Sequence, residues 1–96
     1  MYINLEWDEV KAHANLKKHR VSFEIATHVF LDPLALAYQD RIEHGEQRWQ
    51  TLGMVDGCLL LLVAHAVRHE ENIEIIRIIS ARKADKKERK HYEENR

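Results

Sequence analysis

The chain has 96 residues, of which 45% are hydrophobic and 32% are charged, and its formal net charge is −1 at pH 7. This balance excludes a disordered segment and is typical of one small folded domain, which we expect to span residues 1–96. The longest apolar run, residues 58–64, is far shorter than the roughly 20 residues that a membrane-spanning helix needs. The N-terminal segment lacks the features of a targeting peptide, so we expect a cytoplasmic protein that does not bind membranes.

The single cysteine, Cys58, excludes an intramolecular disulfide and begins the apolar run, where we expect it to be buried. The charged residues are unevenly distributed along the chain. Residues 82–91 hold six basic and two acidic side chains, so positive charge gathers near the C-terminus. Such a cluster favours a nucleic-acid partner, although a solvated helix face has the same composition.

Two short helices are predicted near the N-terminus. Residues 2–7 alternate as a strand, and the carboxylate of Asp8 is placed to cap a helix over residues 9–19. Ser22 repeats the capping signal, and apolar residues then follow a helical period until Asp32-Pro33 ends it.

After this point the hydrophobic period changes to two. It predicts four strands, over residues 34–40, 47–54, 58–67 and 73–80. A charged helix follows over residues 84–96, and its apolar stripe is so thin that it must dock on the sheet or on a partner. The expected fold class is therefore α+β, with a small, twisted, mainly antiparallel sheet, two N-terminal helices and a C-terminal helix.

Asp56-Gly57 predicts a two-residue type I′ hairpin turn, because both positions of that turn need positive φ. In this register Val55 faces Cys58, and Arg48 lies opposite His65. A second hairpin centred near residue 70 places Val63 opposite Arg77. Since alternate and opposed residues share a face, one face of the sheet is expected to carry a converging polar set: Glu46, Arg48, Gln50, His65 and Arg77.

Arg77 is the most informative member of this set, because it interrupts a strand composed mostly of isoleucine. An unpaired guanidinium in a covered strand is costly, so Arg77 needs a carboxylate, a phosphate or an opening to water. Two interpretations remain open, a structural ion pair between Arg77 and Glu46 and a role in binding substrate.

The basic residues after this strand suit phosphate oxygens. Metal-free RNA cleavage uses such groups, because charge grows on the phosphoryl oxygens while protons leave the 2′-hydroxyl and reach the 5′-oxygen. The predicted catalytic residues are Arg77, Arg82 and Lys83, with His65 or Glu46 moving protons. The predicted RNA-binding residues are Arg48, Lys86, Lys87, Arg89, Lys90 and Tyr92.

The seven histidines form no recognised metal motif. His65 and His69 are four residues apart, but they fall on a strand end and its loop, and there is no cysteine pair or HExxH sequence. We therefore expect no metal and no cofactor. Glycine-rich phosphate loops and GxSxG elbows are also missing, so nucleotide-binding and serine-hydrolase functions have no support.

The sequence resembles the BrnT family of small bacterial toxins over nearly its whole length. The matching blocks are Leu5-Glu6-Trp7-Asp8, Lys11, Asn15, Lys18-His19, Ser22-Phe23-Glu24, Val29-Phe30, Asp32-Pro33-Leu34, Glu46-Gln47-Arg48-Trp49, Leu52-Gly53-Met54, residues 76–84, Glu88-Arg89 and Tyr92-Glu93. Residues 76–84 are the most specific block. Arg20 departs from the pattern, because a glycine commonly follows Lys-His there and suits the left-handed residue that ends a helix.

The resemblance implies a RelE-like ribonuclease toxin of a type II toxin–antitoxin system. It also implies a BrnA-like ribbon-helix-helix antitoxin, a toxin–antitoxin heterotetramer, and repression of their own operon through operator DNA bound by the antitoxin. Two other functions stay open on the residues alone. One is a module that binds RNA or a partner without cutting. The other is a structural interaction domain in which Arg77 is an internal ion pair.

Overall fold

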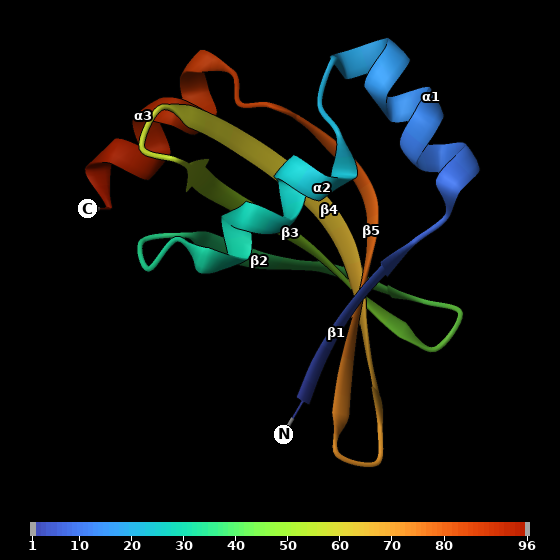
Figure 1. Ribbon diagram of the computed structural model, residues 1–96. Coiled ribbons are helices and arrows are strands. Elements are labelled where there is room, and N and C mark those ends of the chain that lie inside the picture. The colour runs from blue at the N-terminus through green and yellow to red at the C-terminus, as the bar shows by residue number, and fades with distance from the viewer. Residues whose placement is uncertain (1, 96) are drawn as a thin grey trace.

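The computed structural model describes residues 2–95, in which a five-stranded sheet is the central element (Figure 1). The strand order is β1-β5-β4-β3-β2, with β1 parallel to β5 and the other neighbours antiparallel. The strands are β1 Tyr2–Trp7, β2 Leu36–Glu43, β3 Glu46–Val55, β4 Leu59–Glu70 and β5 Ile73–Lys83. The expected α+β class with a mainly antiparallel sheet is confirmed. Met1 and Arg96, the ends of the predicted domain, lie outside the described residues.

The helices begin at the caps that the sequence indicates. In α1, Glu9–His19, the carboxylate of Asp8 accepts from the first backbone N–H groups, and Ser22 does the same for α2, Phe23–Ala26. The short α2 continues as a 3₁₀ helix, η1, Thr27–Leu31. The last helix, α3, spans Lys86–Glu94 and begins with a capping box. No helix within residues 2–95 is long and apolar enough to span a membrane.

Arg20 ends α1 in the left-handed conformation, with φ of +62°. Its backbone N–H donates to the Leu16 carbonyl at 2.9 Å, which closes the last turn. The arginine thus performs the role for which a glycine is better suited, and its Cβ is strained there.

One face of the sheet, here called the helix face, packs against α1, α2 and η1. The core between these layers is built from Val21, Phe23, Ala26, Val29, Val55, Leu61, Val63, Ile78 and Ala81. Asn15 fastens α1 to this core: its side-chain amide donates to the Val21 and Ala81 carbonyls at 2.9 and 2.8 Å, and its oxygen accepts from the Ala81 N–H. The nitrogen and the oxygen of this buried amide therefore both have hydrogen-bond partners.

The opposite face, here called the α3 face, carries a smaller core at one end. Tyr92 of α3 packs there on Leu52 and Leu60, and its hydroxyl donates to Asp32 at 2.6 Å. The same Asp32 oxygen accepts from the Met54 N–H at 2.8 Å, so the end of η1 and the end of β3 are tied to α3. The rest of the α3 face lies beside the helix rather than under it (Figure 1).

The first hairpin register differs by one residue from the prediction. Asp56 and Gly57 have the predicted positive φ, 52° and 73°, but Val55 pairs with Leu59. Cys58 is the extra residue, and it is exposed in the turn rather than buried in the strand. Its N–H still donates to the Val55 carbonyl at 3.2 Å, so the type I′ turn forms and the added residue follows it.

The second hairpin differs by three residues. β4 continues to Glu70 and β5 resumes at Ile73, because a tight turn at residues 71–72 replaces the longer loop that was expected. Arg77 consequently lies opposite Ala66 instead of Val63. A further irregularity lies between Ala64 and His65, where the β4–β5 register shifts by one residue.

Candidate functional site

An arginine row, here Arg48 and Arg77 with Ala66 between them, crosses the α3 face at the end remote from α3. The two arginines are two strands apart, which separates their backbones by about 10 Å. Arg77 donates to Glu46 at 2.7 Å, and its side chain is 34% exposed. The predicted grouping of Glu46, Arg48, Gln50 and Arg77 on one face is therefore correct, and the ion pair leaves part of Arg77 open to water.

Glu46 belongs to a wider ionic network below the arginine row. Its second oxygen lies 3.6 Å from Arg68, which also contacts Glu6 at 3.0 Å and Glu70 at 3.3 Å. Glu46 is the least exposed of these carboxylates, at 16%. The network joins β1, β3, β4 and β5, so it holds Glu46 and Arg77 in fixed positions.

Arg48 is incompletely satisfied. Its Nε is buried and has no hydrogen-bond partner within residues 2–95. A buried guanidinium donor without an acceptor is costly and calls for a ligand, an ion or water. A cavity of about 220 Å³ adjoins it, and its other lining residues come from both faces of the sheet: Asp40, Arg41, Trp49, Gln50, Ala64, His65 and Ile79.

Arg82 lies on the α3 face but not in the arginine row. Its two terminal nitrogens donate to the two oxygens of Glu88, each at 2.8 Å. These bonds lower the pKa of Glu88 and raise the pKa of Arg82. Arg82 thus fixes the first turn of α3 to the end of β5.

Lys83 is not brought together with the other predicted catalytic residues. It pairs with Leu61, whose side chain belongs to the helix-face core, and it lines an apolar cavity with Leu16 and Cys58. The alternation of side chains along β5 sends Lys83 and Arg82 to opposite sides of the sheet.

The side chain of His65 lies on the helix face, so its predicted position opposite Arg48 is wrong, although both residues line the 220 Å³ cavity. The one-residue shift of the first hairpin is the cause, because it pairs His65 with Trp49. The imidazole contacts Thr51 Oγ1 at 2.8 Å and the edge of Phe30, with its Nδ1 buried and unpartnered within the described chain. Burial lowers the pKa of His65 from 6.5 to about 4.

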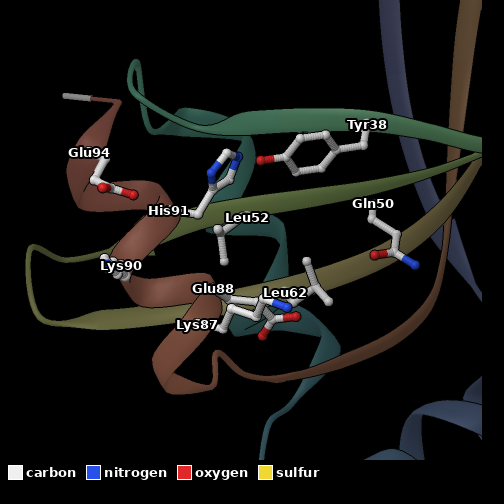
Figure 2. A pocket seen from close by; sticks show the side chains of 9 residues that line it. All are labelled: Tyr38, Gln50, Leu52, Leu62, Lys87, Glu88, Lys90, His91 and Glu94. Carbon is white, nitrogen blue, oxygen red and sulfur yellow. The ribbon is translucent and has the colours of Figure 1, made fainter.

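The basic residues of α3 divide between two sides of the helix. Lys87 and Lys90 line a cavity of about 480 Å³ between α3 and the sheet (Figure 2), whereas Lys86 and Arg89 are exposed elsewhere on the helix. Tyr92 is only 4% exposed and faces the core. Its ring contributes to the docking of α3 and not to the surface of this cavity.

Three further residues on the cavity had no assigned role in the sequence. They are Tyr38 of β2, Gln50 of β3 and His91 of α3. Gln50 was placed on the correct face, and Tyr38 pairs directly with it. The His44-Gly45 turn, where both residues have positive φ, indicates the β2–β3 hairpin but not this pair, because the register shifts by one residue between Gln39 and Arg41. His91 follows Lys87 by one helical turn, so the helical period was its signal.

Within the part of the chain that the structure describes, no group of three or more His, Cys, Asp or Glu side chains is arranged to hold a metal ion. The α3 face instead gathers arginines, lysines and one shared carboxylate. Guanidinium and ammonium groups bind phosphate oxygens, and a carboxylate held between two arginines can accept or return a proton.

Comparison with known proteins assigns the chain to a family. The sequence model described as the ribonuclease toxin BrnT of type II toxin–antitoxin systems matches residues 7–88. The crystal structure of the Brucella abortus ribonuclease toxin BrnT is similar in fold, with a TM-score of 0.67 and 20% identity over 90% of this chain and 100% of that chain. No curated protein matches the sequence. The family match covers most of the chain, and we conclude that the chain belongs to the BrnT family of ribonuclease toxins of type II toxin–antitoxin systems.

Proposed function

We propose that this chain is a metal-independent endoribonuclease with a RelE-like fold that cuts RNA on its α3 face. The family assignment supports the reaction class. The observation that carries the location is the buried Arg48 Nε without a partner, two strands from the half-exposed Arg77 on the same face. A phosphodiester bound there would satisfy Arg48 and share Arg77 with Glu46.

In the proposed reaction, the 2′-oxygen of RNA attacks the adjacent phosphorus and expels the 5′-oxygen of the next nucleotide. Arg48 and Arg77 stabilise the charge that grows on the phosphoryl oxygens. Glu46 accepts the 2′-hydroxyl proton, since it is the carboxylate nearest to Arg77 on this face. The leaving oxygen receives a proton from water or from a cavity group. The products are a 2′,3′-cyclic phosphate and a 5′-hydroxyl.

The first test is cleavage of a labelled single-stranded RNA by the purified chain in excess EDTA. We expect cleavage to persist, with cyclic-phosphate ends that mass spectrometry identifies. Arg77→Ala and Arg48→Ala should each reduce the rate by roughly 10²-fold or more. Arg20→Ala is the matched control, because it removes an exposed arginine on the opposite side of the molecule.

The outcomes separate the proposal from its alternatives. Loss of cleavage in EDTA with recovery on adding Mg²⁺ would overturn the metal-independent reaction. Full activity in both arginine variants would overturn the proposed site. Tight RNA binding without cleavage by folded wild-type protein would favour a module that binds RNA and does not cut it.

We further propose that the chain acts in the cytoplasm as one domain over residues 1–96, where a BrnA-like ribbon-helix-helix antitoxin neutralises it in a heterotetramer that binds operator DNA. Expression of the chain alone should arrest growth, and coexpression with the neighbouring antitoxin should restore it. The mass of the purified complex and its shift of operator DNA on a gel check the assembly. A complex of another stoichiometry, or one that leaves the operator free, would contradict it.

A further inference from the structure

The 480 Å³ cavity between α3 and the sheet is separate from the arginine row but borders it. Its floor is the α3 face of β3 and β4 at Gln50, Leu52 and Leu62, and its wall is the side of α3 that carries Lys87, Lys90 and His91. Gln50 is two residues from Arg48 along β3, so the two side chains point to the same face about 7 Å apart. A cavity of this volume accommodates a ligand of nucleotide size.

Two rings form one side of the cavity. Tyr38 and His91 have centroids 5.8 Å apart with an angle of 32° between their planes, and the hydroxyl end of Tyr38 points toward the imidazole (Figure 2). Tyr38 is 41% exposed, so part of this ring pair remains uncovered. Aromatic and imidazole rings held in this way are the surfaces on which proteins stack unpaired bases.

The Gln50 carboxamide lines the same cavity. One amide offers both a donor and an acceptor, which matches the edge of a nucleobase. The neighbouring strand positions, Ala64 and Ser80, carry small side chains, and Ile79 lines the cavity beside Arg48 together with Gln50.

The charges at the cavity suit a neutral ring attached to an anionic backbone. Lys87 and Lys90 are exposed at its rim. Of the two carboxylates there, Glu88 is already paired with Arg82, and Glu94 lies at the far end of α3. The apolar floor of Leu52 and Leu62 covers the flat part of such a ligand, and the lysines face its phosphates.

We propose that this cavity binds one unstacked nucleobase of single-stranded RNA, and that Gln50 determines which base is accepted. The proposal rests on the proposed function and adds to it the residue that selects the cleavage site. Tyr38 and His91 provide the stacking surface without selecting among bases, because every base has a π face. The phosphate next to the bound base then lies toward Arg48 and Arg77.

The test measures affinity, independently of cleavage. Fluorescein-labelled 2′-O-methyl hexamers of A, C, G and U resist attack by the 2′-oxygen, and their anisotropy reports binding. We expect the wild type to prefer one base by at least about fivefold and Gln50→Leu to reduce that preference to within about twofold. Tyr38→Ala should weaken binding of all four hexamers by roughly tenfold, and Tyr38→Phe should restore it.

Gln39→Leu is the matched control, because Gln39 is exposed on β2 and alternates with Tyr38, so it faces the other side of the sheet. It should leave both affinity and preference unchanged. Thermal unfolding of each variant establishes that the fold persists, and the Phe variant keeps the test valid if Tyr38→Ala unfolds.

The two proposals fail in different ways. If the wild type cuts natural RNA but Gln50→Leu keeps the same base preference and cleavage positions, the base cavity is overturned and the ribonuclease stands. If the wild type binds one hexamer preferentially through Gln50 and Tyr38 yet leaves natural RNA intact, the cavity stands and the ribonuclease falls. Equal affinity of the wild type for all four hexamers overturns the role of Gln50.

Discussion

The guanidinium of Arg82 and the carboxylate of Glu88 meet through two hydrogen bonds of 2.8 Å that join the end of β5 to the first turn of α3. Since both side chains are partly exposed, we expect Arg82→Ala to lower the free energy of unfolding by only about 1 kcal/mol. Displacement of α3 from the α3 face should nevertheless slow cleavage by roughly 10- to 100-fold. Urea unfolding and single-turnover cleavage measure the two effects.

A double-mutant cycle distinguishes positioning from direct contact with RNA. If Arg82 acts by holding α3, Arg82→Ala, Glu88→Ala and the double variant should lose similar amounts of activity. Glu88→Ala with full activity, beside an inactive Arg82→Ala, would instead place the guanidinium of Arg82 on the RNA.

Stability should depend on pH through His65. Burial lowers its folded-state pKa to about 4, while the unfolded chain binds the proton near 6.5. The neutral imidazole therefore contributes fully above pH 6.5, and its contribution is lost as pH falls toward 4. The loss amounts to about 3 kcal/mol across that window. Urea unfolding at several pH values measures it.

His65→Gln should remove most of this slope between pH 6.5 and 4, whereas His13→Gln, at an exposed position of α1, should keep it. An unchanged slope in His65→Gln would show that another group causes the acid sensitivity.

Arg20→Gly should stabilise the protein, because glycine adopts the left-handed conformation that ends α1 without steric cost. The expected gain in the free energy of unfolding is about 1 kcal/mol. Arg20→Ala keeps the Cβ while removing the charge, so it should give no comparable gain. Thermal melts of the two variants separate backbone strain from charge, and equal melting temperatures would argue against strain.

Gly53→Ala should destabilise the packing of η1 on β3. A Cβ at Gly53 would lie 2.8 Å from Val29 Cβ and 3.0 Å from the Val29 carbonyl oxygen. Because backbone atoms block the space, we expect a loss of about 1–3 kcal/mol. Combining it with Val29→Ala should recover only part of the loss. Wild-type stability for Gly53→Ala in urea unfolding would contradict the close contact.

The elements of this fold could be predicted where the signal is local. Asp8, Ser22 and the Asp56-Gly57 turn act within a few residues, and each lies where the sequence indicated. Strand register was less accurate, because one added residue at Cys58 changes every later pair by one. That single residue moved His65 to the helix face.

The residues of the candidate site could likewise be predicted only where the signal is local. Arg77 stood out because a charge interrupts an apolar strand, and its pairing with Glu46 was one of the two alternatives. To predict the contact between Arg82 and Glu88, one must know the angle at which α3 leaves β5, and no local sequence pattern specifies that angle. The parallel pairing of β1 with β5 could also not be predicted from the sequence, since the two strands are about 70 residues apart in the chain.

That pairing has a consequence for how the toxin matures during synthesis. The backbone N–H of Tyr2 donates to the Asn72 carbonyl at 3.0 Å, next to its partner Ile73 in β5. β1 therefore has no neighbouring strand until β5 has been made. Contacts between such distant segments form slowly, and translation delivers the N-terminal end first. Arg77 belongs to the stretch of β5 that pairs with β1, and Arg82 and the lysines of α3 follow it in the chain. Until β5 and α3 have been made, a nascent chain therefore carries no assembled RNA surface.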